Sequence, residues 1–311
     1  MPNDLLSREV FGNIDSVSKS VFYALAAASI TCFCYGIYGR FRLWKLGQKT
    51  ALGIEWRALL NRLFTQVVSP PPSSKQRHRA NAAHLLLFSG FVVLFIGTVL
   101  IAIEHYGATT VGRNATNPLF HKGVYYLVYE FVLDTAGVAM SIGCLWFIYR
   151  RWQGSSSIGH NPLDWGVLGM LLLICVTGYV TEGLRIIREQ TSLPGVSYVG
   201  LGFASLFQLM GTTRSGAAAI HFGLWWVHAL LALGLIAAIP YTRLLHSIAG
   251  AISIACSTDQ PGVMTLISIN EVEQTGQIGV GRVQDFARRQ LLTLDACVSC
   301  GRCEDVCPAH E

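Results

Sequence analysis

Five long apolar runs constrain this chain more than any other feature of its sequence. They lie at about 20–42, 82–104, 124–149, 164–185 and 218–242. Each is close to the ~20 residues that an α-helix needs to cross the hydrocarbon core of a bilayer. Inside lipid only helices and closed barrels can satisfy all their backbone hydrogen bonds. The runs therefore predict an all-α membrane protein whose five transmembrane helices form a bundle.

The composition supports a membrane location. Of the 311 residues, 52% are hydrophobic and only 13% are charged, whereas about a quarter of the residues of a soluble domain are charged. So few charges cannot cover a globular surface, and we expect most of the surface to face membrane lipid. The net charge of +5 is modest, so we expect no nucleic-acid partner and interpret the basic residues as markers of topology.

The distribution of lysine and arginine predicts the orientation. The segment between the first two runs is the richest in these residues, and Arg150, Arg151 and Arg243 follow the third and fifth runs on the same side. Because cytoplasmic loops carry the excess of basic residues, we expect a multi-pass protein of the cytoplasmic (inner) membrane. Its N-terminus lies outside and its C-terminal part is cytoplasmic. The mixed charge before the first run predicts a retained helix rather than a signal peptide.

Four cysteines near the C-terminal end form the clearest chemical motif. Cys297, Cys300, Cys303 and Cys307 have the spacing C-x-x-C-x-x-C-x-x-x-C-P, which is the bacterial ferredoxin pattern for a [4Fe–4S] cluster. Three thiolates in a turn that Gly301 assists can reach three corners of one cubane. Zinc is the alternative, but zinc sites normally use two separated C-x-x-C pairs. The pattern predicts a cytoplasmic, ferredoxin-like [4Fe–4S] tail.

The last cysteine leaves one alternative open. In two-cluster ferredoxins the fourth cysteine of such a run ligates the other cluster, and no second run follows Cys307. Either Cys307 completes a single cluster, or the second half of the cluster domain belongs to a partner or to a longer parent chain. We favour the second interpretation.

The chain outside the spans contains few candidate elements. We expect a surface helix at 49–68, an apolar stretch in the membrane interface at 199–210, a short strand at 263–269 within an otherwise irregular 257–281, and an amphipathic helix at 282–294. We divide the chain into an outer N-terminal segment (1–19), a five-span domain (20–246), a linker (247–281) and an iron–sulfur segment (282–311).

Histidines in the spans are the second chemical signal, because a polar residue inside a membrane is costly and usually functional. His84 and His105 lie near the expected inner and outer ends of the second run, and His228 and His246 near the outer and inner ends of the fifth. On one continuous helix, the 18 residues between the last two make five turns, so they share a face about 27 Å apart. Since the two runs are antiparallel, we expect His84 opposite His246 and His105 opposite His228.

This layout predicts two b haems, each held by a pair of histidines. Two imidazoles fill both axial positions of an iron, so such a haem only passes electrons. His121 and His221 are alternative ligands of the outer haem. Gly90, Gly97 and Gly234 let a flat macrocycle approach the backbone, or they serve ordinary helix packing.

Two stretches carry a resemblance to known families. His84 in HRANAAHLLLFSGF and the His228/His246 pair in WWVHALLALGLIAAIPYTRLLH resemble the cytochrome b gamma subunit of respiratory nitrate reductase. The tail VGRVQDFARRQLLTLDACVSCGRCEDVCPA resembles heterodisulfide-reductase-like iron–sulfur proteins. Over about 20–311 the chain is similar to fused oxidoreductases of the electron-transfer-flavoprotein:menaquinone type. It departs from the gamma subunit at Leu94, where that subunit has its second ligand ten residues after the first, and we expect His105 as the substitute.

The resemblance implies a membrane electron-transfer oxidoreductase linked to the quinone pool. A soluble redox partner, such as an electron-transfer flavoprotein or an iron–sulfur subunit, exchanges electrons with the cluster, the inner haem, the outer haem and then menaquinone or ubiquinone. In the gamma subunit the quinone lies beside the outer haem, which here indicates Glu104, Lys122, Glu182 and Arg185. The alternatives are a membrane anchor or a redox-sensing transporter, each with a structural cluster and no quinone chemistry.

Overall fold

Helices dominate the part of the chain that the structure describes. The computed structural model describes residues 7–49, 61–62, 65, 75–113, 118–154, 162–256, 269–276 and 279–298. Within these ranges it has no β-strand, and one isolated parallel bridge joins Gln48 to Ala287. The prediction of an all-α architecture is confirmed for these residues.

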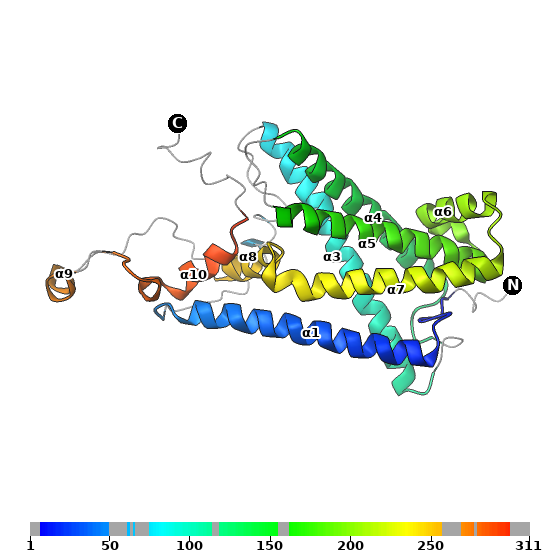
Figure 1. Cartoon of the computed structure of the whole chain (residues 1–311), viewed down its shortest axis with the longest axis horizontal. Coiled ribbons are helices and arrows are strands. Elements are labelled where there is room, and N and C mark those ends of the chain that lie inside the picture. Colours follow the sequence, from blue (N-terminus) through cyan, green and yellow to red (C-terminus); the bar gives the residue numbers. More distant parts are fainter. Residues whose placement is uncertain are drawn as a thin grey trace. The chain divides into compact units, whose positions relative to one another are not determined.

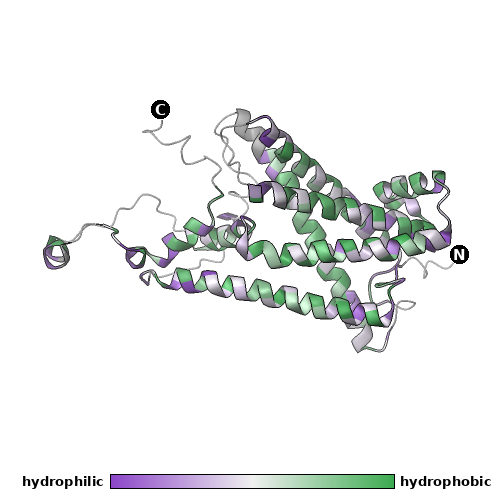
Figure 2. Cartoon of the chain, in the orientation of Figure 1, coloured by the Kyte–Doolittle hydropathy of each residue, from purple (hydrophilic) through white to green (hydrophobic). Residues whose placement is uncertain are grey.

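Within the described part of the chain, five helices are long and apolar enough to cross a membrane. They are α1 (Ser16–Lys45), α3 (Lys75–Thr110), α4 (Gly123–Trp152), α5 (Pro162–Glu189) and α7 (Arg214–Ala238) (Figure 1). Each contains one of the five predicted runs or, for the last, most of it. Only 11–33% of each span is buried inside the chain, and hydrophobic residues predominate along these helices (Figure 2). The remaining surface therefore suits contact with lipid.

Shorter helices connect or follow the spans. They are α6 (Tyr198–Leu209), α8 (Leu245–Ala255), α9 (Ile269–Thr275) and α10 (Arg288–Asp295), with 3₁₀ turns η3 (Pro194–Val196), η4 (Ile239–Tyr241) and η5 (Val283–Asp285). The predicted amphipathic helix is confirmed in part, because α10 starts only at Arg288. Helix α9 occupies part of the segment expected to be irregular, and most of the predicted helix at 49–68 and strand at 263–269 lies outside the described residues.

The chain forms two compact units. Unit 1 comprises Met1–Ala28, Ser74–Gly154 and Trp165–Leu235, and unit 2 comprises Ser29–Ser73, Ser155–Asp164 and Ile236–Glu311. His84, His105 and His228 therefore belong to unit 1, whereas His246 and the cysteine motif belong to unit 2.

In unit 1, small residues let α3 and α4 pack closely. A Cβ atom on Gly90 would lie 2.5 Å from the carbonyl oxygen of Ala136, and one on Gly97 would lie 2.5 Å from the side chain of Leu133. The hydroxyl of Tyr129 also donates to the carbonyl of Gly97 at 2.9 Å. Gly90 and Gly97 thus serve helix packing, which is one of the two roles that the sequence left open.

Helices α5, α6 and α7 enclose a second part of unit 1. Its buried core consists of Leu184, Ile186, Ile187, Ala204 and Ala217. The apolar stretch expected in the interface is thus the helix α6, which covers α5 and α7. The N-terminal end of α6 faces the carboxylates of Glu130 and Asp134 on α4. Negative charge is favourable there because the N-terminus is the positive end of the helix dipole.

In unit 2, the end of α1 holds α8 and α10. Leu245, Ala249 and Leu292 form the buried contact, with Ile37, Trp44 and Ala296 packed against it. Asp295, the last residue of α10, accepts hydrogen bonds from Arg40 at 3.2 Å and Trp44 at 2.7 Å. These contacts fix the segment that leads directly into the cysteine motif.

The fifth apolar run is interrupted before it reaches His246. Helix α7 ends at Ala238, the 3₁₀ turn η4 follows, and α8 begins only at Leu245. Pro240 explains the break, because proline lacks an N–H and its ring clashes with the carbonyl four residues earlier in an α-helix. The assumption that His228 and His246 share one continuous helix is therefore wrong, since the two residues lie on different helices.

The close α3–α4 crossing leads to a stability prediction. Gly90→Ala should lower the midpoint of thermal unfolding in detergent by an amount equivalent to about 1–3 kcal/mol, because the added methyl group overpacks the contact with α4. Gly169→Ala is the matched control, since no atom lies within 4 Å of a Cβ there, and it should be neutral or stabilising. Equal effects of the two substitutions would contradict the packing role.

Candidate functional site

Two of the predicted haem ligands have their Nδ1 atom engaged by the protein. The Nδ1 atom of His228 lies 3.0 Å from Oγ1 of Thr177, and this hydroxyl itself donates to the carbonyl of Leu173 at 2.7 Å. The Nδ1 atom of His246 lies 2.5 Å from the carbonyl oxygen of Arg243. A carbonyl can only accept, and the Thr177 hydroxyl has already used its proton, so both Nδ1 atoms donate. In a neutral imidazole the lone pair is then on Nε2.

That tautomer is the one that metal-binding histidines adopt when a second group orients the ring. A Cβ atom on Gly178 would lie 3.3 Å from Cε1 of His228, so a glycine on α5 leaves room beside this ring. The donor set of His228 and His246 therefore fits an axial haem ligand.

The other two predicted ligands lie on α3 in unit 1. His84 is exposed and stacks on Phe88, with ring centroids 6.0 Å apart. His105 is half-buried and meets Phe11 edge-on at 5.4 Å. Phe11 also contacts Trp225 of α7 at 5.9 Å, three residues before His228. The N-terminal segment thus links α3 at His105 with α7 near His228.

The two alternative outer ligands are buried more deeply. His121 is 1% exposed, and its ring lies 4.5 Å from that of Tyr129. Neither of its nitrogens has a hydrogen-bond partner among the described residues, and neither does Nδ1 of buried His221. Burial, and after it the charge of Arg8, lowers the pKa of His121 to about 4, although Glu104 opposes the shift. His121 is therefore neutral at physiological pH.

Two of the four residues predicted near the quinone, Glu104 and Lys122, have structural positions at the connection between α3 and α4. The carboxylate of Glu104 accepts the backbone N–H groups of Leu119, Phe120 and His121 at 2.7, 2.9 and 3.2 Å. It ties the connection between α3 and α4 to the end of α3. Lys122 is exposed and occupies the N-cap position of α4.

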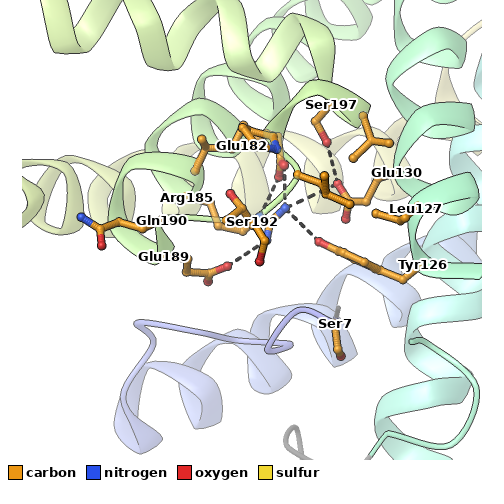
Figure 3. Close-up of a pocket in the computed structure, with 15 residues that line it drawn as sticks. Ser7, Tyr126, Leu127, Glu130, Glu182, Arg185, Glu189, Gln190, Ser192 and Ser197 are labelled. Carbon is orange, nitrogen blue, oxygen red and sulfur yellow. Dashed lines mark hydrogen bonds and ion pairs between the residues drawn. The ribbon is translucent and has the colours of Figure 1, made fainter. Parts of the chain in front are cut away.

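The other two, Glu182 and Arg185, line a polar cavity of about 150 Å³ in unit 1 (Figure 3). Arg185, which is 6% exposed, donates to Glu182 at 2.6 Å, Glu189 at 2.8 Å and Glu130 at 3.5 Å. It also donates to the hydroxyl of Tyr126 at 3.1 Å. This buried guanidinium thus joins α5 to α4.

Several residues of this cavity were not predicted. Glu130 accepts hydrogen bonds from Ser197 at 2.9 Å and Arg8 at 3.3 Å. One turn further along α4 and outside the cavity lining, Asp134 accepts from the backbone N–H of Val199 at 2.8 Å. The sequence did contain one signal for them, since the acidic residues Glu130 and Asp134 lie four positions apart within an apolar run. Charged residues inside a membrane are usually functional. The arginine and serine partners come from distant segments and carry no such signal.

The cavity also presents unpaired hydroxyl groups. Oγ of Ser7 and Oγ1 of Thr191 are buried, and neither has a partner among the described residues. Leaving a buried donor unsatisfied costs about 1–3 kcal/mol. These hydroxyls therefore favour water or a polar ligand in the cavity.

Only the start of the cysteine motif can be described. Cys297 is exposed, and Cys300, Cys303 and Cys307 lie outside the described residues. Among the residues that the structure describes, no three His, Cys, Asp or Glu side chains converge as a metal site. Next to Cys297, the carbonyl of Val298 accepts a hydrogen bond from Arg243 at 2.7 Å.

Comparison with known proteins gives the family. Residues 75–260, more than half of the chain, match the profile described as "Nitrate reductase gamma subunit". The chain belongs to the nitrate reductase gamma subunit family. The resemblance inferred from the histidine-bearing stretches is thereby confirmed, and the membrane helices that carry them are those of a redox-active family.

Curated relatives extend the similarity of this gamma-family chain into its tail. It is 27% identical over 294 residues to the "Probable iron-sulfur-binding oxidoreductase FadF" of Bacillus subtilis, covering 93% of this chain and 40% of that protein. It is 25% identical over 303 residues to the "EtfAB:quinone oxidoreductase" of Syntrophomonas wolfei, with 93% and 40% covered. A "Probable membrane-anchored ferredoxin" of Chromohalobacter salexigens is 24% identical over 304 residues, with 93% and 38% covered.

The gamma-family chain thus spans about two fifths of the length of these relatives. No solved structure matches it.

The buried His121 leads to a prediction about pH. The unfolded chain takes up a proton at His121 near pH ~6.5, whereas the folded chain does so only near pH 4. The contribution of neutral His121 to the free energy of unfolding is therefore fully present above pH ~6.5. It falls by on the order of 3 kcal/mol as the pH is lowered toward 4. His121→Phe should remove this part of the pH dependence. Midpoints of thermal unfolding measured from pH 7 to pH 4 test it, and parallel curves for the two proteins would contradict it.

Proposed function

We propose that this chain is the membrane part of a quinone-linked iron–sulfur oxidoreductase. It passes electrons between a soluble redox partner and the quinone pool, using one [4Fe–4S] cluster and two b haems. The observation that carries the proposal is the shared state of His228 and His246. In both residues Nδ1 donates to the protein, so that Nε2 has the lone pair that iron requires.

For the haems we propose the pairs His84 with His246 and His105 with His228. A haem held by two histidines supplies one-electron exchange with no open position for oxygen. Thr177 and the carbonyl of Arg243 orient the two imidazoles. The family assignment supports this ligand type, and the link that Phe11 makes between His105 and α7 supports the second pair.

For the cluster we propose Cys297, Cys300, Cys303 and Cys307, on the cytoplasmic side. The names of two relatives, an iron–sulfur-binding oxidoreductase and a membrane-anchored ferredoxin, support an iron–sulfur role for the tail. A third relative is named for an electron-transfer flavoprotein and quinone. This name supports an electron-transfer flavoprotein as the soluble partner.

For the quinone we propose the polar cavity around Arg185, on the outer side of the membrane. Reduction of a quinone takes up two electrons and two protons, and oxidation of the quinol releases them. The hydroxyls of Ser7, Thr191 and Tyr126 offer hydrogen bonds to the oxygen atoms of the headgroup. The Glu130 and Glu182 carboxylates hold the Arg185 guanidinium at the wall of this cavity.

The first test of this function is haem content. Purified protein should show b-type bands in a reduced-minus-oxidised spectrum, and His228→Ala and His246→Ala should each lose about one haem per chain, since each removes one axial ligand. Absence of haem from cofactor-replete wild-type protein would favour the anchor or the redox-sensing transporter.

A matched pair of variants tests the orienting hydrogen bond. Thr177→Val should keep both haems but shift the reduction potential of one, because His228 loses the partner of its Nδ1. Thr181→Val is the control, since the Thr181 hydroxyl lies one turn further along α5 and donates to the backbone at 2.7 Å. A shift of the same size in the control would count against the specific role of Thr177.

The cavity can be tested with a nearly isosteric change. Thr191→Val removes only a hydroxyl, and it should raise the KM for quinol-driven haem reduction roughly five- to tenfold, the equivalent of about one hydrogen bond. Reduction by dithionite, which needs no headgroup site, should be unchanged. An unaltered KM in both Thr191→Val and Ser7→Ala would place the quinone elsewhere.

A further inference from the structure

Arg243 occupies a special position in unit 2. It lies in the turn between η4 and α8, three residues before His246. Its Nε atom pairs with Oδ1 of Asp164 at 3.2 Å, and its terminal NH1 group donates to the carbonyl of Val298 at 2.7 Å. Its own carbonyl accepts the Nδ1–H of His246. One residue thus touches both the proposed haem ligand and the backbone beside Cys297.

The ion pair with Asp164 makes this geometry specific. Asp164 is 6% exposed and the side chain of Arg243 is 34% exposed, so the ion pair holds one edge of a partly exposed guanidinium on a buried carboxylate. A guanidinium is a rigid planar fork, so fixing one edge on a carboxylate aims the other donors in a set direction. Here that direction is the carbonyl of Val298.

A second set of contacts holds the same segment from the other side. Arg40 and Trp44 of α1 bind Asp295, two residues before Cys297, and Leu292 packs against Leu245 and Ala249 of α8. Cys297 therefore lies between two anchored positions, Asp295 and Val298. The first anchor holds α10 on α1, and the second reaches Arg243, whose carbonyl binds the ring of His246 on α8.

We propose that Arg243 is a positioning residue for electron transfer between the cluster and the inner haem. It fixes the first cysteine of the motif at a set separation from the His246 imidazole, and it adds a positive charge beside the cluster. This inference rests on the proposed function, because it needs a cluster at Cys297 and a haem at His246. It assigns to one side chain the coupling between the iron–sulfur segment and the membrane helices.

Two consequences can be measured. The rate of electron exchange should fall when Arg243 loses its hold on Val298, because the separation of the two centres is no longer fixed. The reduction potential of the cluster should also become more negative when the charge is removed, since a nearby cation and its hydrogen bonds favour the reduced cluster.

The experiment compares Arg243→Gln with Arg42→Gln, which removes the same charge from an exposed position of α1. The protein is fully reduced with dithionite and mixed anaerobically with excess menadione. Haem oxidation is followed by absorbance, and cluster oxidation by freeze-quench EPR. We expect both variants to keep their haem and cluster and to oxidise haem at the wild-type rate. Only Arg243→Gln should slow cluster oxidation at least tenfold and lower the cluster potential.

Two further variants keep the proposal falsifiable. Arg243→Lys keeps the charge but not the fork, so the potential should recover while the slow cluster oxidation persists. Asp164→Asn keeps Arg243 and loosens its anchor, and it decides the matter if Arg243→Gln fails to hold a cluster. Wild-type rates and potentials in Arg243→Gln, or in Asp164→Asn where it replaces that variant, would overturn the role of Arg243. Wild-type protein without haem bands would instead overturn the proposed function.

Discussion

The guanidinium of Arg185 is the interaction on which unit 1 depends. A charge buried in an apolar bundle is tolerated only when it is paired and hydrogen-bonded. Arg185 meets this requirement with carboxylates from α5 and α4 and with the Tyr126 hydroxyl. One of those carboxylates, Glu130, in turn binds Ser197 before α6 and Arg8 of the N-terminal segment. The network therefore joins four parts of the chain, and its polar groups line the one cavity to which we assign a polar ligand.

Hydrogen bonds also set the state of two half-buried histidines. His228 and His246 satisfy Nδ1 by donating to Thr177 and to the carbonyl of Arg243. The protein thereby selects the tautomer with the lone pair on Nε2. In the proposed function, this tautomer is the one that binds iron.

In unit 2 the decisive feature is the break at Pro240. Had α7 continued, His246 would sit on a straight extension of the span, and Arg243 would point along a regular helix surface. The 3₁₀ turn and the following bend instead expose the carbonyl of Arg243 to the His246 ring and aim its side chain at Asp164 and Val298. The helix break at Pro240 therefore sets how Arg243 attaches the segment that carries Cys297.

The sequence by itself determined the five spans, the family and the candidate ligands. Span length and hydropathy are local properties, and the cysteine and histidine patterns are read directly from residue spacing, so these features need no knowledge of packing. Gly90 and Gly97 show the limit, because a glycine in an apolar run is compatible with either a cofactor or a helix contact. Only the tertiary structure decided for the helix contact there, interrupted the fifth run before His246, and joined Arg185 to Glu130 and Arg243 to Val298. These contacts link residues far apart in the chain, and they depend on which helix faces meet, which residue spacing does not encode.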